Sequence, residues 1–141
     1  MSLEQALKNR RTVRAFGAAA IDPSQLSQLL WAAQGITADR GALRAAPSAR
    51  AALSQNWVAY APIILVITAE YRRITGKYGK RGVRYAMIEA GHIGQNVFLQ
   101  AEALGLKAGI VGAFDDKGVN RTLNIPLSHE PLLVMPIGYR R

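Results

Sequence analysis

The predicted order of secondary-structure elements is that of an α/β or α+β sandwich with few strands. Three observations support this fold class. Residues 22–35 carry the start and stop signals of a helix, residues 62–69 form a continuous apolar run, and residues 83–104 have the pattern of a long helix ended by Gly105. Along the chain, the predicted elements are helix, helix, strand, helix, strand, short helix and strand.

Capping residues define the two helices predicted near the N-terminus. Ser2 and Gln5 form a capping box ahead of a short helix over residues 3–9. Asp22 is the expected N-cap of the second helix, and Gln25 completes its box. Leucines at helical spacing then form one apolar stripe, so this helix is expected to pack against a core.

Three strands are predicted from apolar runs. The run "PIILVITA" at residues 62–69 is typical of a strand buried on both faces. The other two are "KAGIVGAF", at residues 107–114, and "EPLLVMPIGYRR", which ends the chain. Between them, residues 115–124 are expected to form a short helix capped by Asp115.

The length of 141 residues fits a single domain covering residues 1–141. The chain has no cysteine, which excludes a disulfide framework, a thiolate metal site and a thiol nucleophile. Its two histidines lie far apart in the sequence, so no metal site is expected. There is no apolar signal core at the start, and the apolar runs are too short to span a bilayer. We therefore expect a cytoplasmic protein without a membrane segment.

The net charge of +9 indicates an anionic ligand. Arginines outnumber lysines by 13 to 5, and the planar guanidinium group binds two oxygens of a phosphate or carboxylate at once. Charge alone does not distinguish a nucleotide cofactor, a nucleic acid and an acidic peptide. A small nucleic-acid-binding domain ranks last, because few aromatic side chains lie among the cations.

The stretch "KNRRTVRAF" contains the first group of candidate binding residues. Its β-branched and aromatic residues predict an extended conformation. Alternate residues of an extended segment share a face, so Arg10, Thr12 and Arg14 are expected to point the same way, with Val13 toward the core. Two guanidinium groups and a hydroxyl suit a phosphate dianion. The alternative is a solvated basic face.

The second basic segment, "YRRITGKYGKRGVR" at residues 71–84, carries six of the other Lys and Arg residues. On local grounds we expect a flexible charged loop. Lys77 and Tyr78 are adjacent within it. Because neighbouring cations lower the pKa of a lysine, such a residue can act as a base near neutral pH.

Two further patterns allow both structural and functional interpretations. In "GIVGAF", at residues 109–114, the backbone amide of Gly112 or Ala113 is placed to meet a ring nitrogen of a cofactor, or the strand simply turns out of the sheet. The long helix carries small residues that permit close packing of another helix, from the same chain or from a second copy. These are Ala86, Ala90, Gly91 and Gly94.

Taken in order, these stretches resemble the flavin-dependent nitroreductase superfamily, and most closely its azoline dehydrogenase branch. The matching stretches are "RRTVRAF", "LSQLLWAAQGIT", "APSA", "APIILVITAEY", "KYGKRGVRYAMIEAGHIGQNVFLQAEALGL", "GIVGAFDD" and "LLVMPIGYR". The resemblance implies an α+β, nitroreductase-like FMN-binding sandwich with a small sheet flanked by helices. It also implies a homodimer with each flavin at the subunit interface.

The resemblance assigns roles to individual residues. Those implied to meet the FMN phosphate and ribityl chain are Arg10, Arg11, Thr12, Arg14 and Arg140. Pro47 and Ser48 match a segment that reaches the flavin of the partner subunit, and Val111 and Gly112 match the strand end whose amide faces flavin N5. Lys77 and Tyr78 match a catalytic Lys–Tyr pair of the azoline dehydrogenases, in which a base removes a proton from the heterocycle while hydride passes to N5.

The implied activity is that of an FMN-dependent oxidoreductase. A nitroreductase-like version takes hydride from NAD(P)H and reduces a nitroaromatic or quinone, whereas an azoline-dehydrogenase-like version oxidises a peptide heterocycle and returns the electrons to oxygen. After "APSA", however, the chain lacks a family segment of some tens of residues that includes a central strand. Either a dimer partner completes the shortened sheet, or the flavin site is damaged and the chain is a non-catalytic flavin-fold protein that binds a partner.

Overall fold

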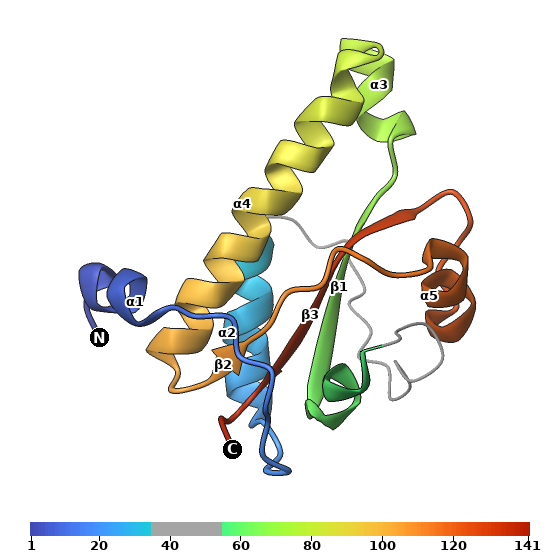
Figure 1. The fold of residues 1–141 in the computed structure, drawn as a ribbon. Helices are drawn as coiled ribbons and strands as arrows, with labels where there is room; N and C mark the ends of the chain where they lie inside the picture. The colour runs from blue at the N-terminus through green and yellow to red at the C-terminus, as the bar shows by residue number, and fades with distance from the viewer. Residues whose placement is uncertain (35–54) are drawn as a thin grey trace.

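The computed structural model describes residues 1–34 and 55–141. Its helices are α1 (Leu3–Asn9), α2 (Pro23–Gln34), α3 (Arg72–Tyr78), α4 (Arg81–Ala103) and α5 (Asp116–Leu123), with a 3-10 helix, η2, over Asn56–Tyr60. Its strands are β1 (Ile63–Ala69), β2 (Lys107–Ala108) and β3 (Glu130–Gly138). The predicted α+β class is confirmed, because a small antiparallel sheet is flanked by helices (Figure 1).

The first two helices begin where their capping residues predict. The Ser2 hydroxyl accepts a hydrogen bond from the backbone N–H of Gln5 (3.2 Å). At α2, the Ser24 N–H donates to the Asp22 carboxylate (2.8 Å), and the Asp22 N–H donates to the Gln25 side chain (3.1 Å). The capping of both helices is therefore confirmed, but the predicted box is complete only at α2. At α1 the Gln5 side chain donates to Asn9 (2.8 Å) and does not reach back to Ser2.

β3 lies at the centre of the sheet, between β1 and β2. The expectation that residues 62–69 are buried on both faces is wrong, because most residues of β1 are half-buried. In the described sheet β1 is also an edge strand. The strand with long buried runs is β3. A continuous apolar run therefore did not distinguish an edge strand from the central one.

Two apolar clusters pack on opposite faces of β3. Met135 and Ile137 belong to the larger cluster, which α2 and α4 cover. Val134 belongs to the smaller cluster, together with Val58 of η2 and Val111. Successive residues of a strand point to opposite faces, so a single strand supplies both clusters. In Figure 1, α2 and α4 lie on one side of the sheet and α5 lies across from them.

The small residues of α4 serve mainly to pack this helix against its own chain. Ala90 and Gly94 are buried, and a Cβ added at Gly94 would lie 3.4 Å from the Leu133 side chain. Gly91 is exposed, and a Cβ added there would meet nothing within 4 Å. Of the two packing partners considered for this face, the same chain therefore accounts for Ala90 and Gly94.

The second basic segment is helical, so the expectation of a loop is wrong. α3 spans most of it, Gly79 turns the chain with a φ of 57°, and α4 begins at Arg81. The two helices approach closely at Gly82, where an added Cβ would lie 3.0 Å from the backbone of Ile74. Together α3 and the start of α4 form an arm that extends away from the sheet (Figure 1).

The strand predicted at residues 107–114 is shorter than expected. β2 comprises Lys107–Ala108, and Val111 adds an isolated bridge to Val134. Asp115 occupies the N-cap position of α5, but its carboxylate makes no capping hydrogen bond. Asp115 therefore stands at the predicted N-cap position, but its side chain does not cap the helix.

Gly109 provides a test of the packing beside β2. A Cβ added there would lie 2.8 Å from the Trp57 ring and 2.8 Å from the Val13 carbonyl oxygen, whereas one added at Gly112 would meet nothing within 4 Å. We expect Gly109→Ala to lower the free energy of unfolding by about 1–3 kcal/mol. Gly112→Ala serves as the matched control and should change it little. Urea denaturation measures both, and equal losses would contradict the close packing at Gly109.

Candidate flavin-binding site

The N-terminal segment at residues 10–17 is extended, as predicted, and pairs with the body of the protein through its backbone. The Val13 N–H donates to the Ala108 carbonyl oxygen (3.0 Å), and the Gly17 N–H donates to that of Tyr139 (2.8 Å). Phe16 and Arg140 form an antiparallel bridge. This pairing places the first basic segment next to β2 and the C-terminal end of β3, so Arg140 lies near it although 126 positions separate it from Arg14.

Phe16 is the main anchor of this segment. The sequence pattern assigned that role to Val13, which is half-buried, whereas Phe16 is buried. The Phe16 ring stacks against Trp57, with 6.4 Å between the ring centroids. Arg14 shares this face with Phe16, because the two residues are two positions apart in an extended stretch.

Two arginines of the segment rest on aromatic rings. The Arg10 guanidinium carbon lies 5.1 Å from the centroid of the Phe98 ring on α4. The Arg14 guanidinium carbon lies 5.8 Å from the centroid of the Trp57 ring. Within residues 1–34 and 55–141, neither guanidinium group forms a hydrogen bond or an ion pair with a side chain or carbonyl. Their N–H groups can therefore receive an anion.

Arg11 and Thr12 lie between these two arginines but differ from them. Arg11 donates from Nη1 to the carbonyl oxygens of Lys8 (3.1 Å) and Arg10 (2.7 Å), so it closes the end of α1. Thr12 is half-buried. The FMN contacts expected of both residues remain predictions, and the geometry gives Arg11 a structural task as well.

The strand end at Val111 and Gly112 offers one free amide rather than two. The Val111 N–H donates to the Val134 carbonyl oxygen (2.8 Å), and the Val111 carbonyl accepts from the Val134 N–H (3.0 Å). Both backbone polar groups of Val111 are therefore used in hydrogen bonds to β3. Gly112 is exposed, and its N–H has no backbone partner in the described part of the chain. Of Val111 and Gly112, Gly112 is the one that can donate to a ligand. The N–H of Ala113, the other amide considered, also has no backbone partner among these residues.

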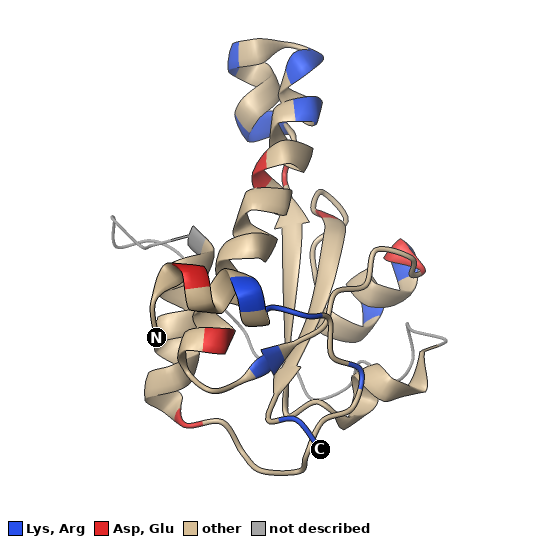
Figure 2. Ribbon diagram, turned by 60° about the vertical axis from the view of Figure 1, so that its left-hand side comes forward, with Lys and Arg blue, Asp and Glu red and all other residues tan. Residues whose placement is uncertain are grey.

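Lys77 and Tyr78 lie on the arm, far from the N-terminal arginines of the same chain. Both side chains are exposed, and the Lys77 ammonium nitrogen lies 5.1 Å from the centroid of the Tyr78 ring. The 17 residues of α4 between Arg81 and Phe98 span about 25 Å at ~1.5 Å per residue. Figure 2 shows cations at the arm and again around the N-terminal segment, β2 and the C-terminus.

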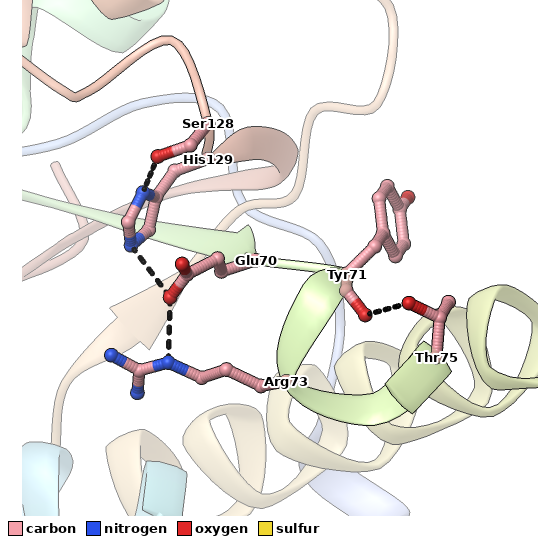
Figure 3. A network of polar contacts seen from close by, with 6 residues as sticks. All are labelled: Glu70, Tyr71, Arg73, Thr75, Ser128 and His129. Carbon is pink, nitrogen blue, oxygen red and sulfur yellow. Dashed lines mark hydrogen bonds and ion pairs between the residues drawn. The ribbon is translucent and has the colours of Figure 1, made fainter. Parts of the chain in front are cut away.

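A polar network ties the base of the arm to the start of β3 (Figure 3). Glu70, at the end of β1, accepts a hydrogen bond from Arg73 (2.6 Å) and lies 3.8 Å from Nε2 of His129. The Tyr71 hydroxyl donates to the Glu130 carboxylate (3.1 Å). Burial, followed by this hydrogen bond, raises the pKa of Tyr71 to about 12.

Glu102 and Lys107 form an ion pair that the sequence analysis missed. The Glu102 side chain is only 3% exposed, and its carboxylate accepts a hydrogen bond from the Lys107 ammonium group (2.5 Å). Glu102 lies one helical turn beyond Phe98, so this pair is close to the ring on which Arg10 rests. The available signal was an acidic residue on the apolar face of α4, with a basic residue five positions later.

Two predicted site residues, Pro47 and Ser48, lie outside the described residues. Over residues 1–34 and 55–141, no helix is long and apolar enough to cross a membrane. The same residues contain no group of three or more His, Asp or Glu side chains placed to hold a metal ion.

Comparison with known proteins identifies the class to which this fold and site belong. Residues 49–139 match the model of the nitroreductase family. A relative from Methanocaldococcus jannaschii, provisionally named a nitroreductase, is 34% identical over an alignment of 183 residues that covers 98% of this chain and 91% of the relative. The chain therefore belongs to the nitroreductase family, and this membership supports an activity of the oxidoreductase class.

Solved structures support the fold independently. A nitroreductase family protein from Clostridium novyi NT has a TM-score of 0.82 at 18% identity, over 100% of this chain and 86% of that one. An FMN-dependent nitroreductase from Clostridium difficile R20291 has a TM-score of 0.75 at 18% identity, over 96% of this chain and 86% of that one. At this level of identity the likeness establishes the fold.

The raised pKa of Tyr71 predicts a loss of stability in alkali. Between pH 10 and pH 12 Tyr71 is ionised in the unfolded chain but stays protonated in the folded protein. The stabilisation present below pH 10 is therefore lost as the pH approaches about 12. We expect the free energy of unfolding to fall less over this interval in Tyr71→Phe than in the wild type. Urea denaturation at several pH values measures it. Tyr60→Phe, which alters an exposed tyrosine, should behave as the wild type, and identical falls in all three proteins would contradict the assignment.

Proposed function

We propose that this protein is an FMN-dependent oxidoreductase that works as a homodimer. The observation that carries the proposal is the pair of guanidinium groups of Arg10 and Arg14, which have free N–H groups and lie next to the sheet on a nitroreductase fold. Two such groups suit a phosphate dianion. The name of the C. difficile structure, an FMN-dependent nitroreductase, supports FMN as the flavin.

The chain's residues fit the two ends of this cofactor. Arg10 and Arg14, with Thr12 and Arg140, would hold the phosphate and ribityl chain. The exposed Gly112 N–H would donate to flavin N5, and a Cβ added at this position meets nothing within 4 Å, which leaves room for a ring. When bound, FMN supplies the hydride chemistry, and the protein contributes orientation and the hydrogen bond that adjusts N5.

A second copy of the chain is the proposed partner. The outer side of α4 carries the exposed apolar side chains of Met87 and Ile88, which are 52% and 51% exposed, next to the bare surface of Gly91. Trp31 of α2 is also exposed. Grouped apolar surface of this kind is typical of an interface. In a homodimer, Pro47 and Ser48 would reach the partner's flavin, as the family resemblance implies.

The substrate is either a nitroaromatic or quinone, reduced with NAD(P)H as donor, or a peptide azoline that is oxidised. In the azoline version, Lys77 acts as the base that takes the proton released by the heterocycle, with Tyr78 beside it. The ring of Tyr78 packs edge-on against that of Tyr85, with 5.3 Å between centroids, which holds it on the arm. Lys77 ends α3 beside the start of α4, and Arg81 at that start lies about 25 Å along α4 from Phe98, so this role requires the flavin of the other subunit.

The alternative is a shortened flavin-fold protein that binds a partner without catalysis. The alignment with the M. jannaschii relative is longer than the 141 residues of this chain, so it contains gaps on this chain's side. This supports the proposal that an internal segment is missing. A missing strand at the flavin would remove contacts to its ring, and such a protein would retain the fold without binding the cofactor.

Reconstitution with FMN distinguishes these two functions. The purified chain is incubated with FMN, desalted and examined by absorbance and by sedimentation. We expect retained flavin bands, one flavin per subunit and the mass of a dimer. Arg14→Gln should weaken retention about 10-fold or more, since a charged hydrogen bond is lost, whereas Arg121→Gln on α5 should not. A colourless wild-type protein would favour the non-catalytic alternative.

Lys77→Ala distinguishes the two chemistries of the flavin-loaded dimer. If Lys77 is the base for azoline oxidation, its loss should lower kcat for that reaction by about 100-fold or more. Reduction of a nitroaromatic by NAD(P)H should change little, because it needs no such base. Lys80→Ala removes a nearby arm cation and is the matched control. Azoline oxidation that survives in Lys77→Ala would exclude the general-base role.

A further inference from the structure

The arm formed by α3 and the first turns of α4 carries a concentration of positive charge. Residues 71–84 include six Lys and Arg residues and no Asp or Glu. Among the residues that the structure describes, one of the six forms an ion pair, Arg73 with Glu70 (2.6 Å). The other five side chains are exposed and have no acidic partner there: Arg72, Lys77, Lys80, Arg81 and Arg84.

The packing of the two helices directs these cations outward. α3 meets α4 through Ile74, against whose backbone an added Cβ at Gly82 would lie at 3.0 Å. The cations flank this contact without entering it, and all of them are exposed. Residues three apart are neighbours on a helix surface, so Arg81 and Arg84 lie side by side on α4. Figure 2 shows the cations around the arm, clear of the sheet.

This distribution of charge is unfavourable for the folded chain by itself. Lys80, Arg81 and Arg84 stand at the N-terminal end of α4, where the helix dipole favours negative charge, and neighbouring cations repel one another. The first turn of α4 contains no acidic residue. The sequence has no acidic run that could neutralise the arm, since only Asp115 and Asp116 of its nine acidic residues are adjacent. An anionic partner from outside the chain would relieve the repulsion.

The tyrosines of the arm favour an acidic peptide over a nucleic acid as that partner. Single-stranded nucleic acids stack their bases on open aromatic faces. Tyr78 and Tyr85 instead pack edge to face, with 5.3 Å between centroids, and the Lys77 ammonium nitrogen lies 5.1 Å from the centroid of the Tyr78 ring. These contacts occupy ring faces that stacking would need. Carboxylates need no ring, and they accept paired hydrogen bonds from guanidinium groups.

We propose that the arm is a docking surface for an acidic peptide segment, whose Asp and Glu side chains pair with Arg72, Lys80, Arg81 and Arg84. This inference goes beyond the proposed function, because the binding itself needs no flavin. Only its consequence for catalysis rests on that function. In the azoline version Lys77 lies on the same arm, so acidic residues near the heterocycle would favour a peptide as substrate.

The test measures the fluorescence anisotropy of a labelled peptide in which glutamates alternate with glycine and serine. In the double variant Arg81→Gln, Arg84→Gln we expect binding to weaken about 3- to 30-fold, because two exposed charge pairs are lost. Arg72→Gln, on the other helix, should weaken it by a smaller factor. The double variant Lys117→Gln, Arg121→Gln removes the same charge from exposed positions of α5 and should leave binding unchanged.

Urea denaturation separates lost binding from lost structure. The unfolding midpoint of the Arg81→Gln, Arg84→Gln variant should equal or exceed that of the wild type, because removing these cations relieves repulsion at the start of α4.

Two further probes identify the class of partner. A peptide with glutamine in place of every glutamate should not bind, and oligothymidylate of equal charge should bind more weakly than the acidic peptide. A wild-type chain that does not bind the acidic peptide, binds oligothymidylate more tightly, or loses affinity equally in both double variants would overturn the inference and leave the proposed function intact. A chain that binds the acidic peptide but retains no FMN would overturn the proposed function alone.

Discussion

The pairing of residues 10–17 with β2 and with the end of β3 is the constraint on which the site depends. The backbone hydrogen bonds of Val13 and Gly17, with the buried ring of Phe16, turn a highly charged N-terminal stretch into part of the sheet layer. The pairing holds the three arginines of this segment close together despite their mutual repulsion. From this segment Arg10 reaches a ring on α4 and Arg14 reaches a ring on η2.

The sheet depends in a similar way on a single strand, β3. β3 serves two apolar clusters, and both β1 and β2 depend on it for their hydrogen bonds. A sheet of this size is near the lower limit for independent stability, so much of the stability must come from α2 and α4. In the described residues, the outer edge of β1 has no partner strand. Unpaired edges invite a further strand, which agrees with the proposal that a second subunit completes a shortened sheet.

The sequence predicted what depends on local chemistry and missed what depends on distant contacts. The caps at Ser2 and Asp22 located both N-terminal helices, because their hydrogen bonds close within a few residues. The arm was mistaken for a loop because glycines and cations dominate its composition, yet close packing at Gly82 makes it a helical hairpin. Other contacts could be seen only in the folded chain, because each joins separate elements. They are the ion pair of Glu102 with Lys107, the aromatic rings under Arg10 and Arg14, and the hydrogen bonds of Val111 to β3. The flavin contacts expected of Pro47 and Ser48 remain predictions.

The two groups of cations explain why a second subunit belongs to the proposed mechanism. They lie at opposite ends of α4, and the 17 residues from Arg81 to Phe98 span about 25 Å, which separates Lys77 from the N-terminal arginines of its own chain (Figure 2). If both groups serve one flavin, they must come from different subunits. The network of Glu70, Arg73 and His129 lies at the base of the arm that carries Lys77 (Figure 3). In the azoline version of the proposal, a dimer would therefore be a geometric requirement, because Lys77 and the N-terminal arginines would have to come from different subunits.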